Sequence, residues 1–394
     1  LTGDIGSAYE SRDSALLPVD SWFSNYYTPV STVSSYGTTV WLYNPGSSNL
    51  NITYQRRSSG VLTSSTLTVP GGSAGGYLKQ VIPNGTGARF YSSGAPFYAL
   101  STTDSTNDYS SNNQWWDWGF TLIPEDSLTS QALVGLGIGR DPGSPTNPEE
   151  DGNPVWVTPV GNGDTYVTVY VDYDSNPFTG NLTDPNGNKY DAYYSLRELE
   201  QAKIYDNVDR DQTGMLVYTL AANCKLAVAW GQDPSVATAG APGLDVGTGV
   251  PPAPLFDGGK NGTLDVDNDG DGFISPEDIL RFTIVINNVG RTPVPDIVLV
   301  DNLPEDTTYV LNSTYFTNAS GVVSQIPDNT TGTPFPLDDG GVTLNPLSSL
   351  PIHGSYEVTF QVAIDSYEEL TPGTTGILNT GSASDIFTTI NVLD

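Results

Sequence analysis

The sequence predicts an all-β protein built from several antiparallel β-sandwiches, the last of them immunoglobulin-like. Short apolar runs are separated by turn-forming residues about every ten positions, which is the spacing of strands in a sandwich. The chain of 394 residues also holds 42 glycines and 29 prolines, residues that favour turns over long helices. Because one ordinary sandwich is shorter than this chain, the sequence predicts more than one domain.

Changes in composition divide the chain into four predicted parts. The first is a polar N-terminal arm at 1–35, a candidate donor strand for a neighbouring molecule. A β-sandwich surface module follows at 36–240, with a candidate split into two subdomains near 105–115. A linker rich in proline and glycine at 241–262 then precedes an immunoglobulin-like domain at 263–394.

Strands are expected wherever an apolar or alternating run ends at turn residues. Those of the first half of the module are 38–43, 51–54, 60–69, 77–82, 88–91 and 96–102. Those of its second half are 132–138, 155–158, 165–172, 215–220 and 225–230. The C-terminal domain is expected to hold 280–287, 296–300, 308–311, 341–344, 356–364 and 377–392. One short helix is predicted at 195–203.

The charge balance excludes nucleic acid as a partner. There are 45 acidic residues and 14 basic residues, for a net charge of −31, and binding to phosphate requires a basic surface. No stretch approaches the roughly 20 apolar residues of a transmembrane helix, so we predict no membrane insertion. The excess acid fits solubility in salty water or the capture of divalent cations, and the two interpretations are compatible.

The ends and the cysteine content favour a secreted protein without disulfides. We interpret Leu1 as a mature N-terminus left after removal of a signal peptide, which predicts a location at the cell surface or in an extracellular matrix. The single cysteine, Cys224, lies in an apolar run and is expected to be a buried core residue. Stability must therefore come from a large core, from a metal or from assembly.

The residue inventory argues against an enzyme. His353 is the only histidine and Cys224 the only thiol, which leaves no base for a serine or cysteine nucleophile. The glycine-rich run at 135–139 lacks the strand–turn–helix context of a dinucleotide site. Paired carboxylates for glycoside hydrolysis stay open as a minor alternative because acidic residues are abundant.

The strongest motif is an acidic loop at 267–278 that matches a calcium-binding loop. Such a loop needs oxygen ligands at positions 1, 3, 5, 7, 9 and 12, with glycine at position 6. Gly272 occupies position 6. The ligand positions are held by Asp267, Asp269, Asp271, the carbonyl of Phe273, Ser275 and Asp278. The last is Asp where Glu is usual, which shortens its reach, and Asp265 is a further candidate ligand.

The residues after the loop alternate as a strand does, so the motif is not a helix–loop–helix calcium sensor. We expect Ca²⁺ to fix the start of the C-terminal domain, to stiffen the linker and to set the interdomain angle. Two weaker acidic clusters are metal candidates for which a solvated turn is the favoured alternative. They are Asp172, Asp174 and Asn176, and Asp206, Asp209 and Asp211.

An aromatic cluster is formed by Trp115, Trp116 and Trp118. Such a cluster can stack on sugar rings and bind a glycan. A position in a sandwich core or at an interface is the favoured alternative, because tryptophan buries a large area.

The C-terminal domain resembles the conserved-repeat family of bacterial and archaeal surface proteins, a domain of unknown function. The resemblance rests on the acidic loop, on 280–290, on Val298–Pro304 and on Leu378–Gly381. It implies an immunoglobulin-like spacer or assembly module.

Region 95–256 resembles a module found before those repeats, similar to the N-terminal part of IgGFc-binding-like proteins. Its carriers are 117–122, 154–159, 170–174, 211–214 and 229–234. This second resemblance implies a surface location and no known catalysis.

Two functions follow from these patterns. The first is a non-enzymatic structural subunit, stabilised by calcium, that assembles with copies of itself into a filament, sheath or surface layer. The arm at 1–35 could add a strand to the open sheet edge of a neighbour and so extend the polymer through backbone hydrogen bonds. The alternative is a monomeric cell-surface adhesin or glycan-binding module that uses the tryptophan cluster.

Overall fold

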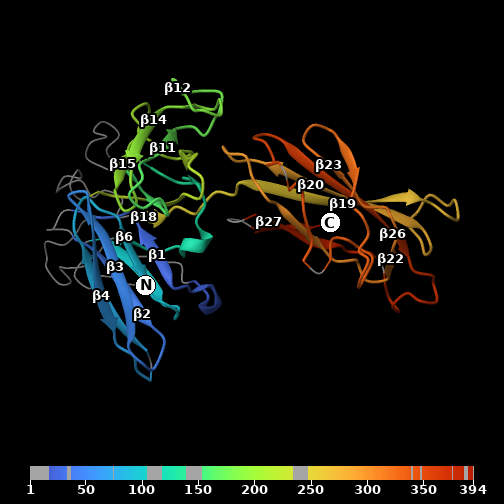
Figure 1. The fold of residues 1–394 in the computed structure, drawn as a ribbon, viewed down its shortest axis with the longest axis horizontal. Coiled ribbons are helices and arrows are strands. Elements are labelled where there is room, and N and C mark those ends of the chain that lie inside the picture. The colour runs from blue at the N-terminus through green and yellow to red at the C-terminus, as the bar shows by residue number, and fades with distance from the viewer. Residues whose placement is uncertain are drawn as a thin grey trace. The chain divides into compact units, whose positions relative to one another are not determined.

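The structure is a computed structural model. It describes residues 17–32, 37–73, 75–103, 118–138, 153–233, 247–338, 340–346, 348–374, 376–385 and 389–393. These residues form antiparallel β-sheets and two short 3₁₀ turns, η1 (Val19–Ser21) and η3 (Glu125–Ser127), without an α-helix in the described part. The chain divides into two compact units, unit 1 (Leu1–Ala253) and unit 2 (Pro254–Asp394), drawn in Figure 1. The predicted all-β, multi-sandwich class is confirmed.

The first sandwich of unit 1 packs two four-stranded sheets face to face. One sheet has the order β1 (Asn25–Thr28), β6 (Ala88–Tyr91), β3 (Leu50–Ser58), β4 (Val61–Val69). The other has the order β5 (Gly76–Ile82), β2 (Thr38–Asn44), β7 (Tyr98–Thr103), β8 (Gly119–Thr121). Alternating residues point inward, as strand geometry requires, and fully buried side chains such as Leu42, Ile52 and Phe90 fill the space between the sheets.

The second sandwich of unit 1 has the same two-layer plan. One sheet has the order β15 (Ala202–Ile204), β10 (Val155–Val160), β17 (Lys225–Gly231), β18 (Gly247–Gly249). The other has the order β14 (Ala192–Leu196), β11 (Val167–Asp172), β16 (Leu216–Thr219), β9 (Gln131–Leu133), and a small hairpin joins β12 (Leu182–Thr183) to β13 (Lys189–Tyr190). Cys224 is buried, as predicted, and burial raises the pKa of its thiol to about 11.

The helix predicted at 195–203 is wrong. Its residues end β14, make a turn and begin β15. Leu196, Leu199 and Ala202 have the spacing of a helix face and are all buried, but they enter two different apolar clusters. Leu199 has a φ of 64°, which a right-handed helix does not contain. Tertiary packing therefore accounts for the apolar spacing that suggested a helix.

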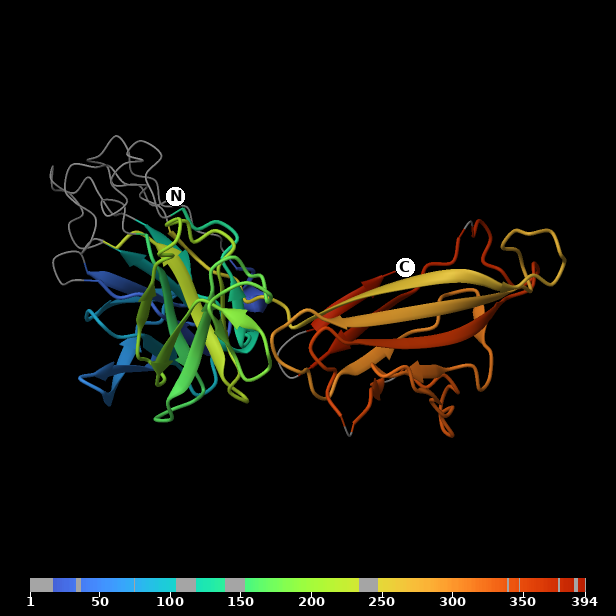
Figure 2. The same ribbon diagram turned by 90° about the horizontal axis from the view of Figure 1, so that it is seen from above.

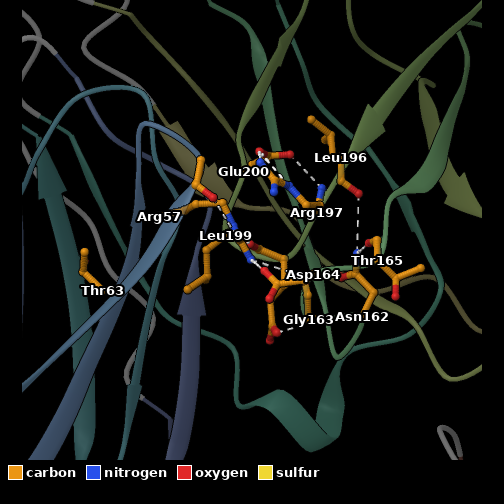
Figure 3. Close-up of polar contacts among 12 residues, drawn as sticks. Arg57, Thr63, Asn162, Gly163, Asp164, Thr165, Leu196, Arg197, Leu199 and Glu200 are labelled. Atoms are coloured by element: carbon orange, nitrogen blue, oxygen red, sulfur yellow. Dashed lines mark hydrogen bonds and ion pairs between the residues drawn. The ribbon is translucent and has the colours of Figure 1, made fainter.

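A polar seam joins the two sandwiches of unit 1 around Arg57, whose side chain is almost fully buried. Its guanidinium donates hydrogen bonds from Nε to the carbonyl of Glu198 (2.9 Å) and from Nη1 to that of Gly60 (3.0 Å). Nη2 donates to the carbonyl of Gly163 (3.3 Å) and lies 2.8 Å from Oδ1 of Asp164, as Figure 3 shows. One side chain from β3 thus satisfies carbonyl groups from three segments.

We expect Arg57→Ala to lower the free energy of unfolding of unit 1 by about 2–4 kcal/mol, because three carbonyls lose a charged donor. All seven tryptophans lie at or before residue 230, so denaturant unfolding followed by tryptophan fluorescence reports on unit 1. The neighbouring Arg56 lies on the opposite face of β3, and Arg56→Ala is the matched control with a loss below about 1 kcal/mol. Equal losses in the two variants would contradict the prediction.

Unit 2 is a single sandwich with immunoglobulin topology. Its larger sheet has the order β19 (Phe256–Val266), β20 (Ile279–Asn288), β26 (Ser355–Ile364), β23 (Tyr315–Thr317), β24 (Val323–Gln325), with β22 (Thr307–Tyr309) also on β26. The smaller has the order β25 (Val342–Thr343), β21 (Val298–Asp301), β27 (Thr380–Ser384), β28 (Thr389–Leu393). In chain order these are the A-B-E-D and C-F-G arrangements of that fold. Figure 2 shows β19, β20 and β26 side by side.

Two predicted segments differ from the observed structure. Residues 256–262 of the predicted linker form the first half of β19 and pair with β20. In the predicted arm, β1 pairs with β6 inside unit 1, so 25–28 already belong to a sheet. Residues 1–16 of the arm and the candidate split near 105–115 lie outside the described residues, and the domain limits remain predictions.

Candidate metal centre

The acidic loop at 267–278 connects β19 to β20 at the tip of their hairpin. Two glycines shape it: Gly270 has a φ of 76° and Gly272 a φ of 81°, values that favour glycine over residues with a side chain. A Cβ at either position would meet no atom within 4 Å. Backbone conformation therefore explains these glycines, as the spacing of the motif predicts.

Asp267 organises the first half of the loop. Its Oδ2 accepts a hydrogen bond from the backbone N–H of Gly272 (2.7 Å), and its Oδ1 accepts one from Gly270 (2.6 Å). These two bonds, the one from Gly272 above all, hold the pKa of Asp267 below its usual range. The carboxylate is therefore ionised at neutral pH, which calcium coordination requires.

Asp269 and Asp271 complete a cluster of three carboxylates. Asp269 Oδ1 accepts from the N–H of Asp271 (3.1 Å), and Asp271 Oδ1 accepts from the N–H of Phe273 (2.7 Å). One ligand oxygen from each of the three aspartates lies within 4.8 Å of the other two. Two oxygens that share one calcium at about 2.4 Å can be at most about twice that distance apart, so the three oxygens fit one ion.

Asp278, at position 12, is hydrogen-bonded to two other residues of the loop. Its side chain is fully buried. Oδ1 accepts from the N–H of Asn268 (2.8 Å), while Oδ2 accepts from the N–H (2.8 Å) and the hydroxyl (3.0 Å) of Ser275. These bonds, led by the one from Asn268, lower the pKa of Asp278. Asp278 and Ser275 therefore stabilise the loop beside the cluster of Asp267, Asp269 and Asp271. Asp278 is not one of these three grouped carboxylates.

Asp265, the further candidate ligand, forms an ion pair with Arg281. Its two carboxylate oxygens accept from Arg281, from Nε at 2.9 Å and from Nη2 at 3.0 Å, and Oδ2 also accepts from Gln361. The hydrogen bond from Arg281 holds the pKa of Asp265 below its usual value. The proposed extra ligand is thus engaged by a cation of the protein itself.

The predicted effect of calcium on the linker stays a prediction, and the place of the loop in unit 2 does not favour it. Unit 2 begins at Pro254, and β19 then runs for 11 residues before the loop starts, a length of about 35 Å. The loop is instead tied to the end of β26, where Glu277 N–H donates to the carbonyl of Ile364 (3.0 Å) and Ile364 N–H to that of Asp278 (2.8 Å). A bound ion would stiffen this remote end of unit 2.

The two weaker acidic clusters of unit 1 form turns. Asp174 accepts from the hydroxyl of Thr179 (2.9 Å) and from the N–H of Asn176 (3.1 Å). Asp206, Asp209 and Asp211 each accept from a backbone N–H two residues onward. Burial raises the pKa of Asp206, and Asp172 is fully buried. In the part of the chain that the structure describes, neither cluster brings three acidic oxygens within 4.8 Å of one another.

Of the aromatic candidates, Trp118 lies in the core of unit 1. It is 2% exposed, stacks on Phe120 with centroids 5.7 Å apart, and donates from its indole N–H to the carbonyl of Gln232 (2.9 Å). A sugar cannot reach a ring in that position. Trp115 and Trp116 lie outside the described residues.

Sequence reasoning did not single out β4 as a sheet edge. The strand has the sequence VLTSSTLTV and forms the last strand of its sheet in the described structure. Most of its side chains are exposed, including Val61 at 64% and Leu62 at 44%. The signal available in the sequence was a run of nine residues that contains no charged residue and no proline. Natural edge strands usually carry charged residues or proline, which block pairing with another strand.

No protein-family model and no curated protein matches the chain, so the two resemblances drawn from the sequence remain predictions. Among solved structures, the T6 backbone pilin of serotype M6 Streptococcus pyogenes aligns at 14% identity over 62% of this chain, with a TM-score of 0.26. A protein described as membrane-anchored from Corynebacterium diphtheriae aligns at 12% identity over 94% of this chain and 83% of its own, with a TM-score of 0.23. The first alignment spans 63% of the pilin chain. Scores this low carry no argument about function.

Proposed function

We propose that this chain is a non-enzymatic structural protein of a cell surface or extracellular matrix, stabilised by calcium, which assembles with copies of itself into a filament, sheath or surface layer. The observation that carries the proposal is the open edge of β4 in unit 1. The calcium loop of unit 2 is a second, independent support. No helix in the described residues is long and apolar enough to cross a membrane.

The edge of β4 has the properties of a strand-accepting surface. Its nine residues are uncharged and rich in valine, leucine and threonine, which favour β-structure. Its partner β3 is paired along the whole strand from Leu50↔Val69 to Ser58↔Val61, so β4 is held in the sheet over its full length. An extended segment can add to such an edge through main-chain hydrogen bonds.

The occupant we propose for this edge is a strand from a second copy of the chain. The donor cannot be 25–28, because these residues pair with β6 in their own unit. Phe23 also bridges Phe97, so the donor we propose is the part of the arm that precedes Phe23. Because each copy then offers one donor and one acceptor, the contact is head-to-tail and can propagate.

Assembly is tested with two lysines placed on the β4 edge. Ser64→Lys with Thr66→Lys adds charges where both native side chains are exposed, and we expect light scattering and negative-stain microscopy to show loss of polymers. Thr68→Lys lies near the end of the strand and should have a smaller effect. The matched control is Thr183→Lys with Leu182→Lys on β12, which adds the same charge at exposed positions. Polymers that survive the β4 change but not the β12 change would overturn the edge proposal.

Chelation of calcium is expected to lower the thermal midpoint of unit 2 by several degrees and to leave unit 1 unchanged. The physical reason is that three ionised aspartates repel one another unless a cation neutralises them, and an ion that binds only the folded state stabilises it. Differential scanning calorimetry with and without millimolar calcium measures the shift. An unchanged midpoint would count against the metal site.

The matched variant is Asp271→Asn, which keeps the size of the side chain and removes one charge. It should weaken calcium binding in isothermal titration and abolish most of the thermal shift. Asp257→Asn, on β19 and hydrogen-bonded to Asn287 at 2.9 Å, removes the same charge away from the loop and should leave the shift intact. A protein that stays monomeric with calcium and binds glycans would favour the adhesin alternative.

A further inference from the structure

Three polar side chains that are far apart in the sequence meet inside unit 2. Lys260 belongs to β19, in the larger sheet, whereas Asp301 ends β21 and Asn379 directly precedes β27, both in the smaller sheet. The ammonium of Lys260 is hydrogen-bonded to Oδ2 of Asp301, and both side chains are fully buried. The lysine therefore spans the core from one sheet to the other.

The surroundings of this lysine are apolar. Its Nζ lies 5.2 Å from the ring centroid of Phe282 and 5.4 Å from that of Phe360. Both rings are fully buried. An apolar, dry setting disfavours the ammonium form of lysine and favours the neutral amine, which is the nucleophilic form.

The amide of Asn379 interacts with the same carboxyl group. Its side chain is 1% exposed, and neither its oxygen nor its nitrogen completes a hydrogen bond of standard geometry. Its contact with Asp301 nevertheless lowers the pKa of that carboxyl group. Buried amides are almost always hydrogen-bonded, so an unsatisfied one beside a buried amine and a carboxyl group needs an explanation.

A glycine makes room for this arrangement. Asp301 pairs with Gly381 across β21 and β27. A Cβ at 381 would lie 2.6 Å from Oδ2 of Asp301, which is too close for any real side chain. The absence of a side chain at 381 thus leaves room for the Asp301 carboxyl group, which interacts with both the lysine and the amide.

We propose that Lys260 and Asn379 form an intramolecular isopeptide bond, with Asp301 as the acid–base residue that transfers the protons. The product is an amide cross-link between β19 and the start of β27. It joins the two sheets of the sandwich covalently. The assignment is independent of the assembly proposed above.

The reaction balances without a co-reactant. Asp301 takes a proton from the Lys260 ammonium, and the free amine attacks Cγ of Asn379. Asp301 then gives that proton to Nδ2, and the Cγ–Nδ2 bond breaks as ammonia leaves. The second proton that Nζ loses when the Nζ–Cγ amide forms passes through Asp301 to this ammonia, so a lysine ammonium and an asparagine amide become a secondary amide and an ammonium ion. Neither oxidation nor reduction occurs.

The acid–base behaviour of Asp301 supports this role. Burial raises the pKa of its carboxyl group to about 6, although Lys260 and Asn379 act in the opposite direction. A pKa near neutrality suits a group that must accept and return a proton in one reaction.

The cross-link is tested by the intact mass of the full-length protein under denaturing conditions. We expect a mass one ammonia below that of the sequence. Asn-Gly pairs, such as Asn162-Gly163, can also lose ammonia by cyclisation, so peptide mapping must locate the loss. Trypsin has no site after Arg291. The cross-linked protein should therefore release 226–281, uncut at Lys260, joined to 292–394 as one branched species.

Three variants separate the roles. Asn379→Ala and Lys260→Arg should each show the full mass calculated from the variant's own sequence. In Asn379→Ala, trypsin should also cut after Lys260. Asp301→Ala should leave both reacting groups in place and yet abolish the bond. The control is Lys203→Arg, in which the altered lysine pairs with the buried Asp233 of unit 1 at 2.6 Å, and its ammonia loss should persist. A wild-type mass equal to the sequence mass, or separate linear peptides 226–260 and 292–394, would overturn the proposal.

Discussion

In a protein that carries Asn379→Ala, so that no cross-link can form, replacing Lys260 with alanine is expected to lower the free energy of unfolding of unit 2 by about 3–5 kcal/mol, the cost of removing one partner from a buried ion pair. Asp301 would be left in the core between the sheets with no cation beside it. The contacts of the lysine Nζ with the rings of Phe282 and Phe360 would also be lost. Few single substitutions in unit 2 should have a larger effect.

The pH dependence of this variant gives a second signature. The pKa of Asp301 in the folded protein, about 6, lies above its ordinary value of 3.8. The folded state therefore binds a proton more tightly than the unfolded state, and unfolding free energy falls as the pH rises from about 4 to about 6. Without Lys260, which lowers this pKa, the decline should continue to higher pH, and adding Asp301→Asn should remove it.

Calorimetry or hydrogen exchange is the suitable measurement, because unit 2 contains no tryptophan. Tryptophan fluorescence then provides an internal control, since it should report an unchanged unit 1. Arg281→Ala removes a cation from a partly exposed pair with Asp265 and should cost less than about 1 kcal/mol. Asn379→Ala removes the proposed cross-link and keeps the ion pair. A loss for Lys260→Ala no larger than that for Arg281→Ala would contradict the prediction.

Replacing Trp118 with alanine is expected to lower the free energy of unfolding of unit 1 by about 3–5 kcal/mol. The ring is packed so closely that a Cβ at Gly247 would lie 2.0 Å from it, and one at Gly231 would lie 2.7 Å from it. The variant also leaves the carbonyl of Gln232 without the indole donor. Trp118 therefore joins the edge of the first sandwich to β17 and β18 of the second.

Denaturant unfolding followed by the remaining tryptophans measures this loss. Trp41 is a suitable comparison, since it is partly exposed and donates a hydrogen bond to Thr102 (3.0 Å), and Trp41→Ala should cost less. Gly247→Ala should destabilise unit 1 in the same direction as Trp118→Ala by forcing the ring to move. If Trp118→Ala left the stability of unit 1 unchanged and abolished binding to glycans, the prediction would be contradicted and a glycan-binding role for Trp118 would be favoured.

Features set by local chemistry could be predicted from the sequence. The alternation of 279–286 predicts a strand, and β20 (Ile279–Asn288) shows buried residues at every second position because side chains of a strand point to opposite faces. The acidic loop at 267–278 is also local. Its two glycines with positive φ and its first three aspartates all lie within six consecutive residues, so their spacing alone determines that the carboxylates come together.

Features that depend on distant partners could not be predicted. The apolar spacing at 195–203 is the same in a helix and in two buried strand ends, and only the packing of Leu199 against a separate cluster decides between them. Residues 256–262 resemble a linker because they are polar and rich in glycine, yet they pair along β20. Lys260 and Asp301 are 41 positions apart, and the local sequence around either residue does not indicate that the other is its partner. Strand pairing across the sandwich brings them together, because the cost of burying each charge is met only by its partner.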